Sequence, residues 1–555
     1  MAMTDYAPAD TLDERPRERR TGSLREWLAP PIPGSVLIGW LGPLLVTAFA
    51  GFLRFDRLAS PHAVVFDETY YAKDALALLK FGWEHSTVKD ADKLLLADQN
   101  ANIWADGPAF VAHPPAGKWM IALGEWMFGA TPFGWRFLPA LAGTLSVLVL
   151  CRVARRMTGS TLLGCAAGLL LALDGLMFVT SRAALLDIFV MFWVLAAFAC
   201  LVADRDVSRR RLAEAVERSA DSPAGSLGPL GPFLAHWWRI PAGLCLGMAL
   251  ATKWTGIYYI AAFGIMVVLW DYGARRAAGV ERPFSGALAL ESGPAFVQLV
   301  VVAAITYLAS WWGWIFRPGG WGRGDVAGFA PWRLVEAMPD LWKYHREMWK
   351  FHTGLDAKHP YQSWPWDWPI LHRPVAFFYS EPKGQCGAAK CSREILGIGT
   401  PILWWGALIA LVICVGLWAV LRDWRAGAIL LGVLAGWLPW FVPAFSERTM
   451  FLFYATPMIP FMVLAVVLVL GHLIGPAREP SPRFTPDSVA GAGTDAGTGA
   501  GTGTAVGTRR IVGATAAGAF VLLVLVNFAY FYPILAAKVI TYDQWKDRIW
   551  FNSWI

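Results

Sequence analysis

Residues 401–444 read PILWWGALIALVICVGLWAVLRDWRAGAILLGVLAGWLPWFVPA, two long apolar runs divided by the polar break RDWR. Each run has roughly 18 or more residues, enough to cross a hydrocarbon core of about 30 Å as a helix. Similar runs recur along the 555 residues, of which 56% are hydrophobic and 16% charged. A soluble surface needs more charge than this. We therefore predict an all-α polytopic membrane protein.

The apolar runs predict about eleven transmembrane helices. A basic segment precedes the first run, but no small-residue cleavage site follows it, so we interpret that run as a retained helix and not as a signal peptide. The predicted spans lie near residues 36–53, 134–152, 161–180, 184–203, 238–252, 255–271, 296–316, 401–421, 427–444, 450–473 and 511–532.

Arginine predicts the orientation of these spans. Alternate short loops are arginine-rich, as at Arg155, Arg210, Arg275, Arg425 and Arg509, and the N-terminal segment is basic as well. Because basic loops stay in the cytoplasm, we expect the N-terminus there and the opposite loops outside the cell membrane. The same loops account for the net charge of +7, so a nucleic-acid partner is not expected.

This topology predicts a simple division of the chain. Two large extracytoplasmic loops carry most of the Trp, Pro, His and carboxylate residues outside the spans, so the function should lie there. No internal repeat suggests a transporter built from two halves. The predicted parts are a cytoplasmic tail (1–35), a transmembrane core (36–474) with loops 54–133 and 317–400, a disordered Gly/Thr/Ala-rich cytoplasmic linker (475–510), and a last helix with an extracytoplasmic tail (511–555).

An acidic pair stands out in the first outward loop. Residues 64–80 read VVFDETYYAKDALALLK, in which Asp67 and Glu68 open a helical pattern of apolar positions. An acidic pair at a helix N-terminus can simply cap free amides and complement the helix dipole. It can also supply a catalytic carboxylate. The pair alone does not separate these two interpretations.

The same loop carries a second motif, VAHPPAGKWMIALGEWMFG, at residues 111–129. Its two prolines stiffen the backbone after His113, and Lys118 falls on the first turn of a Trp-rich amphipathic helix that could lie in the membrane interface. Such a pair is usually only part of a solvated loop. At membrane level, beside carboxylates, these residues could instead contact a lipid phosphate.

Several charged residues stand at the outer ends of spans, where an unpaired charge is costly. They are Arg54, Arg136, Arg182, Asp187 and Lys253. Snorkelling towards the interface would explain the basic ones, and Arg182 with Asp187 could form a structural ion pair. Because all five are predicted at one membrane face, we expect them to take part in a site.

The second large outward loop is aromatic and rich in proline. Residues 352–380 read HTGLDAKHPYQSWPWDWPILHRPVAFFYS, and the prolines exclude a regular helix and favour a rigid platform for an extended peptide or a sugar. Candidate acceptor-binding residues are His359, Tyr361, Trp364, Trp366 and Arg373. Interfacial aromatic belts are the alternative explanation.

Two cysteines share this polar loop. If the loop is extracytoplasmic, Cys386 and Cys391 could form a disulfide, whereas two thiols alone make a poor zinc site. No cluster of His and Cys at metal-binding spacing, no Gly-rich phosphate loop and no nucleophile elbow occurs in the sequence. A metal cofactor is therefore not indicated, although a divalent metal stays possible.

The motifs together resemble, in order and spacing, the protein O-mannosyltransferases, which are C-fold glycosyltransferases. The match is to the bacterial, actinobacterial-type branch, because the second loop is too short for the β-trefoil domain of eukaryotic members. The matching stretches are FLRFDRLASPHAVVFDETYYAKDA, HPPAGKW, GWRFLPALAGT, RAALLDIFVMFW, ALATKWTG, HPYQSWPWDWP and SERTMFLFYATPMIPF.

The resemblance implies a specific reaction. Such enzymes move one mannose, with inversion, from polyprenyl-phosphate-mannose to a Ser or Thr hydroxyl of a secreted or translocating protein. The family's acidic pair falls on Asp67 and Glu68, and its functionally important arginines on Arg54 and Arg136. We expect Asp67 to be the base and Glu68 to position the acceptor or the loop. Cations expected at the donor phosphate are Arg136, Arg182, Lys253 and either His113 or Lys118.

Two alternatives stay open at this stage. A related C-fold enzyme that places aminoarabinose or another sugar on a lipid would also use an acidic first loop followed by a Pro-Pro motif. A transporter or flippase would need charges spread through the bilayer, whereas here they cluster at one face. Membrane lipids and the export machinery are the remaining expected partners.

Overall fold

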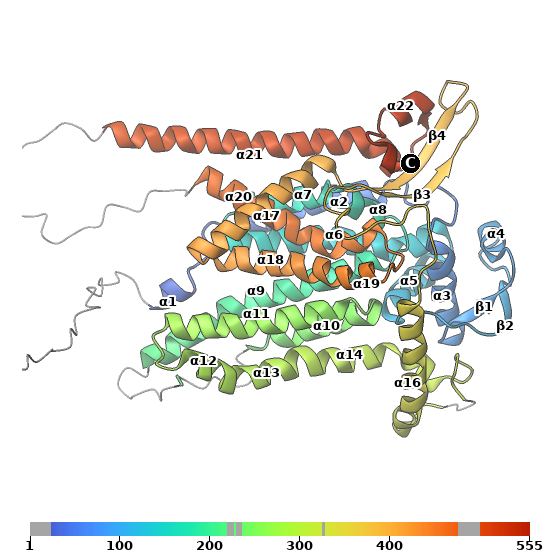
Figure 1. Cartoon of the computed structure of the whole chain (residues 1–555), viewed down its shortest axis with the longest axis horizontal. Helices are drawn as coiled ribbons and strands as arrows, with labels where there is room; N and C mark the ends of the chain where they lie inside the picture. The colour runs from blue at the N-terminus through green and yellow to red at the C-terminus, as the bar shows by residue number, and fades with distance from the viewer. Residues whose placement is uncertain (1–23, 219–226, 229–235, 325–327, 476–499) are drawn as a thin grey trace, which may run out of the picture.

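Long helices run side by side in one bundle, and irregular segments gather at one end of it (Figure 1). The computed structural model describes residues 24–218, 227–228, 236–324, 328–475 and 500–555, with the side chains of 500–507 left aside. We call the end that carries α3 (Glu68–Phe81), α5 (Ala116–Phe128) and α16 (Trp332–Thr353) the loop end and the opposite end the basic end. The prediction of a mainly helical polytopic fold is confirmed.

Nine helical segments of the described chain are long and apolar enough to cross a membrane. Two more predicted spans correspond to the shorter helices α7 (Thr161–Ala172) and α10 (Arg239–Thr252). The nine are α2 (Val36–Phe55), α6 (Pro132–Thr158), α9 (Asp187–Arg218), α11 (Gly256–Ala277), α12 to α14 (Pro283–Ser310), α17 (Pro401–Leu421), α18 to α19 (Trp424–Phe445), η6 to α20 (Leu452–Ile474) and α21 from Thr508 to Leu535.

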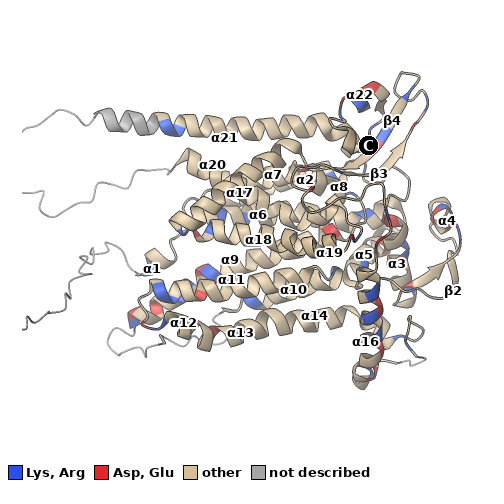
Figure 2. Ribbon diagram, viewed as in Figure 1, with Lys and Arg blue, Asp and Glu red and all other residues tan. Residues whose placement is uncertain are grey.

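The outer helices of the bundle expose apolar side chains. Val36 on α2 and Val412 on α17 are 76% and 73% exposed, whereas α9 and α20 are largely buried in the core. Most of the length of the long helices carries no charged residue, and charges gather towards their ends (Figure 2). An apolar surface around a packed core is what a lipid solvent requires.

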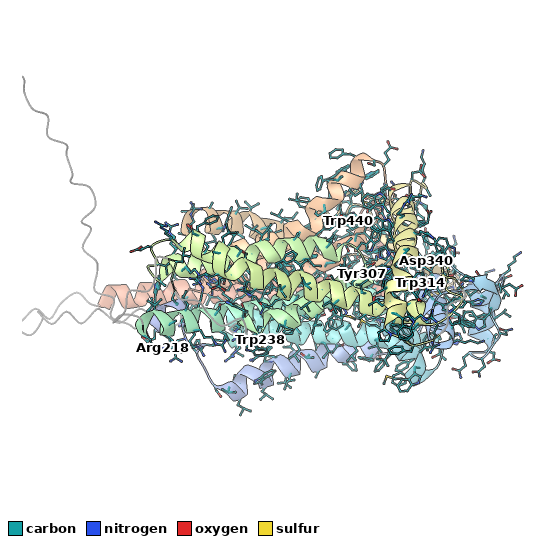
Figure 3. All side chains as sticks on the ribbon, turned by 90° about the horizontal axis from the view of Figure 1, so that it is seen from below. Arg218, Trp238, Tyr307, Trp314, Asp340 and Trp440 are labelled. Carbon is teal, nitrogen blue, oxygen red and sulfur yellow. A yellow bond between two sulfur atoms is a disulfide. The ribbon has the colours of Figure 1, made fainter. Side chains whose placement is uncertain are left out.

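Buried ion pairs join three helices at the basic end. The Arg239 guanidinium of α10 donates from Nε to Asp204 of α9 at 2.9 Å and from Nη2 to Asp271 of α11 at 2.8 Å. Charges buried this deeply require such partners. Arg218 lies towards this end in Figure 3, whereas Trp314 and Asp340 lie towards the loop end.

The loop end is built mainly from helices outside the long spans. Helices α3 (Glu68–Phe81) and α5 (Ala116–Phe128) come from the first predicted outward loop, and α16 (Trp332–Thr353) from the second crosses the bundle direction (Figure 1). The remaining short elements are α1 (Leu24–Leu28), β1 (His85–Thr87), α4 (Ala91–Ala97), β2 (Trp104–Pro108), α8 (Gly175–Thr180), α15 (Trp312–Phe316), α22 (Tyr542–Lys546) and η8 (Asn552–Trp554).

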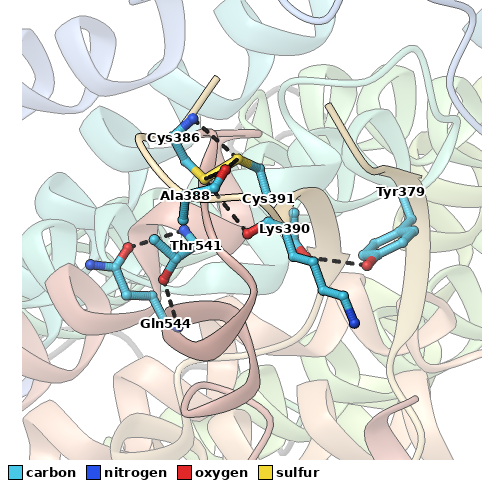
Figure 4. The surroundings of a disulfide bond; sticks show 8 residues. Tyr379, Cys386, Ala388, Lys390, Cys391, Thr541 and Gln544 are labelled. Atoms are coloured by element: carbon cyan, nitrogen blue, oxygen red, sulfur yellow. Dashed lines mark hydrogen bonds between the residues drawn. A yellow bond between two sulfur atoms is a disulfide. The ribbon is translucent and has the colours of Figure 1, made fainter. Parts of the chain in front are cut away.

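A small antiparallel sheet was not predicted by the sequence. Strand β3 (Val375–Ser380) pairs with β4 (Cys391–Gly397), and β4 pairs with the short β5 (Ile540–Thr541) that follows α21. The structure joins Cys386 and Cys391 in a disulfide at the tip of the β3–β4 hairpin (Figure 4). The chain after α21 therefore packs against the second predicted outward loop.

The predicted linker at 475–510 is only partly within the described chain. Residues 476–499 lie outside it, as do residues 1–23 of the predicted N-terminal tail. Helix α21 begins at Ala500, earlier than the span predicted near 511–532. The prediction of a disordered linker is therefore wrong for residues 500–510: the helix of the apolar segment extends into them without a new nucleus, although their Gly and Thr residues disfavour helix.

Candidate functional site

The two acidic residues of the first motif lie in different environments. Asp67 occupies the N-cap position of α3, but its side chain accepts no capping hydrogen bond. Glu68 is fully buried and accepts four hydrogen bonds. Its Oε1 accepts from Arg136 Nε at 2.7 Å and from the Ala184 amide at 3.0 Å, and its Oε2 from Arg136 Nη2 and the Val65 amide, both at 2.8 Å. The Glu68 carboxylate is therefore fixed by hydrogen bonds within the protein, whereas the Asp67 carboxylate does not cap the helix.

Arg136 ties the first loop to α6. Besides the Glu68 carboxylate, its Nη1 donates to the Pro61 carbonyl at 3.0 Å and its Nη2 to the Ala63 carbonyl at 2.7 Å. All three nitrogens thus donate to protein oxygens. We expected this residue at the donor phosphate; its contacts instead favour a positioning role.

Arg182 and Arg54 also contact the protein rather than an open space. Arg182 Nη1 donates to the carbonyls of Arg54 and Asp56, at 2.7 and 2.8 Å, where α2 ends. Arg54 is fully buried, and its Nη2 contacts Met177 Sδ at 2.5 Å while its Nε has no hydrogen-bond partner among the described residues. The ion pair of Arg182 with Asp187, one of two predicted alternatives, is not formed.

Asp187 pairs instead with Lys253. Lys253 follows α10, and its Nζ donates to Asp187 Oδ2, at the start of α9, at 2.7 Å. The Asp67 carboxylate interacts electrostatically with both charged groups. Burial raises the pKa of Asp67 to about 6, Lys253 opposes this rise and Asp187 adds to it. Three groups from three parts of the chain therefore share one electrostatic environment.

A cavity of about 630 Å³ opens beside this pair. Lys253 and Asp187 line it, together with His352 of α16 and Arg448. The ammonium of Lys253 also lies 5.1 Å from the ring centre of Tyr454. The other walls are largely apolar and aromatic, and include Ile257, Tyr259, Trp349, Pro439, Trp440, Val442, Pro443 and Pro457. The cavity therefore joins a cationic end to an apolar surface.

His113 and Lys118 differ in their position relative to this cavity. His113 lines it, and its buried Nδ1 has no hydrogen-bond partner in the described chain. Burial, with nearby cations, holds the pKa of His113 well below its ordinary value, so the ring is neutral. Lys118 is buried behind it and donates to Glu84 and, at 3.1 Å, to the His113 carbonyl. Lys118 therefore stabilises the backbone at His113, and the His113 ring faces the cavity.

Residues 359–374 contain no regular helix, as the prolines predicted. The Trp364 and Trp366 rings stack with their centres 5.6 Å apart. The Tyr361 amide donates to His359 Nδ1 at 3.2 Å. Arg373 holds this segment to the chain end, because it donates to the Pro360 carbonyl at 2.7 Å and to the Ser553 carbonyl at 2.6 Å.

Aromatic rings connect this second loop to the acidic pair. Phe66, next to Asp67, has a φ of +50° and stacks on Phe377 of β3 at 4.9 Å. It also packs against Phe451 and Phe453 at 6.1 and 5.7 Å. A left-handed conformation is costly for phenylalanine, so these rings help to fix the backbone at Asp67.

Two cavity residues were missing from the predicted site. Arg448 lies in the stretch SERTMFLFYATPMIPF but was not among the predicted site residues, and its Nε donates to the His352 carbonyl at 3.0 Å. His352 was not singled out, and burial lowers its pKa to about 4. His352 is the first residue of the quoted stretch 352–380, and no motif there marks it as a site residue. Within the described chain, no group of three or more His, Cys, Asp or Glu residues is arranged to hold a metal ion.

Two family profiles match the chain. The profile for dolichyl-phosphate-mannose-protein mannosyltransferase matches residues 44–216, and the one for the C-terminal four-transmembrane region of protein-O-mannosyltransferase matches residues 337–554. In fold, the chain is similar to the Saccharomyces cerevisiae protein O-mannosyltransferase Pmt1–Pmt2 complex bound to the sugar donor. That likeness has a TM-score of 0.68 at 14% identity and covers 96% of this chain and 94% of that one.

Bacterial relatives match over nearly the whole length. The protein of Mycolicibacterium smegmatis is 37% identical, and the match covers 93% of this chain and 93% of that protein. The protein of Mycobacterium tuberculosis is 36% identical, and the match covers 93% of this chain and 92% of that protein. The protein of Corynebacterium glutamicum is 32% identical, and the match covers 92% of both chains. Each is named polyprenol-phosphate-mannose–protein mannosyltransferase. The chain belongs to the dolichyl-phosphate-mannose-protein mannosyltransferase family.

Proposed function

We propose that this protein transfers one mannose from polyprenyl-phosphate-mannose to Ser or Thr hydroxyls of exported proteins, at the outer face of the cell membrane. The names of the bacterial relatives support the donor and the protein acceptor. They give no support to a lipid acceptor such as the aminoarabinose transferases modify. The observation that carries the proposal is that the Asp67 carboxylate shares an electrostatic environment with the Asp187–Lys253 ion pair, and that this pair lines a partly apolar cavity.

In this proposal Asp67 is the general base. The acceptor hydroxyl oxygen bonds to the anomeric carbon of mannose as the bond from that carbon to the phosphate oxygen breaks. Asp67 takes the hydroxyl proton, and polyprenyl phosphate leaves with the electron pair. A carboxyl whose pKa is raised to about 6 is a stronger base than an ordinary aspartate and is still mostly ionised at neutral pH. Glu68 positions the loop through Arg136 and does not touch the acceptor.

Lys253 and Arg448 are the cations that we assign to the donor phosphate. Both line the cavity, whereas the side chains of Arg136 and Arg182 are turned to protein oxygens. Charge that develops on the leaving phosphate is stabilised best by cations already fixed in place. His113, neutral and facing the cavity, is placed to hydrogen-bond the sugar or the phosphate.

The polyprenyl chain would lie on the apolar side of the cavity. Ile257 of α11 and Val442 of α19 line it and are 53% and 73% exposed, so the cavity reaches the surface that lipid would cover. We assign the acceptor to the segment that holds His359, Tyr361, Trp364, Trp366 and Arg373. Association with the export machinery, a cytoplasmic N-terminus and outward loops complete the proposal.

The test is mannose transfer by the purified chain from polyprenyl-phosphate-mannose to a Ser/Thr-rich peptide. Asp67→Asn should reduce transfer by at least 10²-fold while the protein stays folded, because the base is lost. Asp106→Asn is a matched control in the same loop, since Asp106 is exposed on strand β2. Near-normal transfer by Asp67→Asn would remove the base assignment, and transfer to a glycolipid but not to the peptide would favour the lipid-modifying alternative.

A further inference from the structure

A second crevice of about 580 Å³ lies along α16. Five of its lining residues come from α16 and one, Trp254, from the segment between α10 and α11. The set is Trp254, Trp342, His345, Arg346, Trp349 and Lys350. We call it the α16 crevice.

The α16 crevice adjoins the cavity assigned to the donor. Trp254 and Trp349 line both. Trp254 is fixed as the dividing wall, because its Nε1 donates to the Tyr307 hydroxyl at 3.1 Å and that hydroxyl lies 2.6 Å from His345 Nε2. A ligand that leaves the donor cavity past Trp349 would therefore meet the α16 crevice directly.

The position of α16 places this crevice at the membrane surface. The helix crosses the direction of the spans where they end (Figure 1). Trp342 and Trp349 are 69% and 63% exposed, and exposed Trp residues at this level are typical of a membrane interface. Indole rings in such a place offer an apolar surface to a lipid chain.

The rim of the crevice is cationic. Arg346 is exposed, and its guanidinium has no hydrogen-bond or ion-pair partner in the part of the chain that the structure describes. Lys350, one turn further on, pairs with the exposed Glu347 at 2.6 Å, a contact that a stronger anion can replace. Two cations above an aromatic crevice suit an amphipathic ligand with an anionic head group.

We propose that the α16 crevice is a second site for polyprenyl phosphate, which receives the lipid product when it leaves the donor cavity. This inference rests on the proposed function, which names that product. A phosphate monoester carries more negative charge at neutral pH than the phosphodiester donor, so Arg346 and Lys350 favour the product over the donor. Zwitterionic lipids gain less from the two cations.

Native mass spectrometry of the full chain, titrated with polyprenyl phosphate, tests the proposal. The wild type should bind two molecules per chain. The double variant Arg346→Gln/Lys350→Gln should keep one and bind the second about 25-fold more weakly, from roughly fivefold for each basic residue lost. Lys343→Gln is the matched control, since Lys343 is exposed on the same helix but outside the crevice. This control should bind two.

Several outcomes would overturn the inference. A polyprenyl phosphate site would be excluded if the wild type bound only one molecule, or if the double variant bound two molecules equally well. It would also be excluded if an equal concentration of phosphatidylglycerol displaced the second molecule. A dimer mass that the double variant loses would assign the crevice to a second copy of the chain. Asp67→Asn should still bind two molecules, so loss of transfer in that variant separates failure of the catalytic proposal from failure of this one.

Discussion

Replacement of Glu68 by Gln should destabilise the protein through Arg136. The carboxylate accepts four hydrogen bonds in a fully buried site, two of them from the guanidinium. Glutamine keeps one acceptor oxygen, and its amide group would face donors at the other position. Breaking one side of a buried ion pair typically costs about 3–5 kcal/mol, because the remaining charge stays buried.

The assay is the melting temperature of the purified protein in detergent, with mannose transfer measured on the same samples. For a chain of 555 residues, a cost of that size corresponds to a fall on the order of 3–4 °C. Glu336→Gln is the matched control, because Glu336 is half-exposed in a surface pair and should melt within about a degree of the wild type. Asp67→Asn should melt no lower than the wild type. A Glu68→Gln variant that melts normally but has lost transfer would refute the positioning role and move Glu68 into the chemistry.

Three further predictions concern Asp67, Lys253 and the disulfide. Because Asp67 must be deprotonated to act and its pKa is about 6, kcat/KM for the peptide should fall as pH drops through about 6; a limb near 4 would contradict the burial argument. Lys253→Gln should lower kcat/KM for the lipid donor by about 10²-fold, with partial recovery in Lys253→Arg, and unchanged donor kinetics would remove Lys253 from the phosphate. Peptide mapping without reduction should recover Cys386 linked to Cys391, and free thiols at both would contradict the pairing.

The spans could be predicted because lipid imposes a length and a composition that can be counted along the chain. The run 401–421 therefore agrees with α17, and the run 450–473 with η6 and α20 together, to within a few residues. Helix α16 was missed for the opposite reason. Its face towards the protein is formed by Ala337, Leu341, Tyr344 and Met348, but many positions between them are charged, so the segment lacks the apolar composition by which the spans were counted.

The sequence predicted which charged residues belong to the site, but not which of them form ion pairs with one another. Lys253, Asp187 and Asp67 were all candidates, yet nothing in their spacing indicated that Lys253 would form its ion pair with Asp187. Arg136 and Glu68 are 68 positions apart, and only the packing of α6 against the first loop brings them together. His352 could not be recognised in sequence, because a single histidine gains meaning only from the cavity into which α16 places it.

Strand β5 gives the protein a fixed order of assembly. It follows α21, so β4 receives this neighbour only after the last long apolar helix has been synthesised. The same delay holds for Trp545, which donates to Glu394 at 2.5 Å, and for Ser553, which accepts from Arg373. A nascent chain that has not yet extended beyond α21 therefore lacks the contacts that brace its second loop. Completion of that loop is thus coupled to synthesis of α21 and of the residues that follow it.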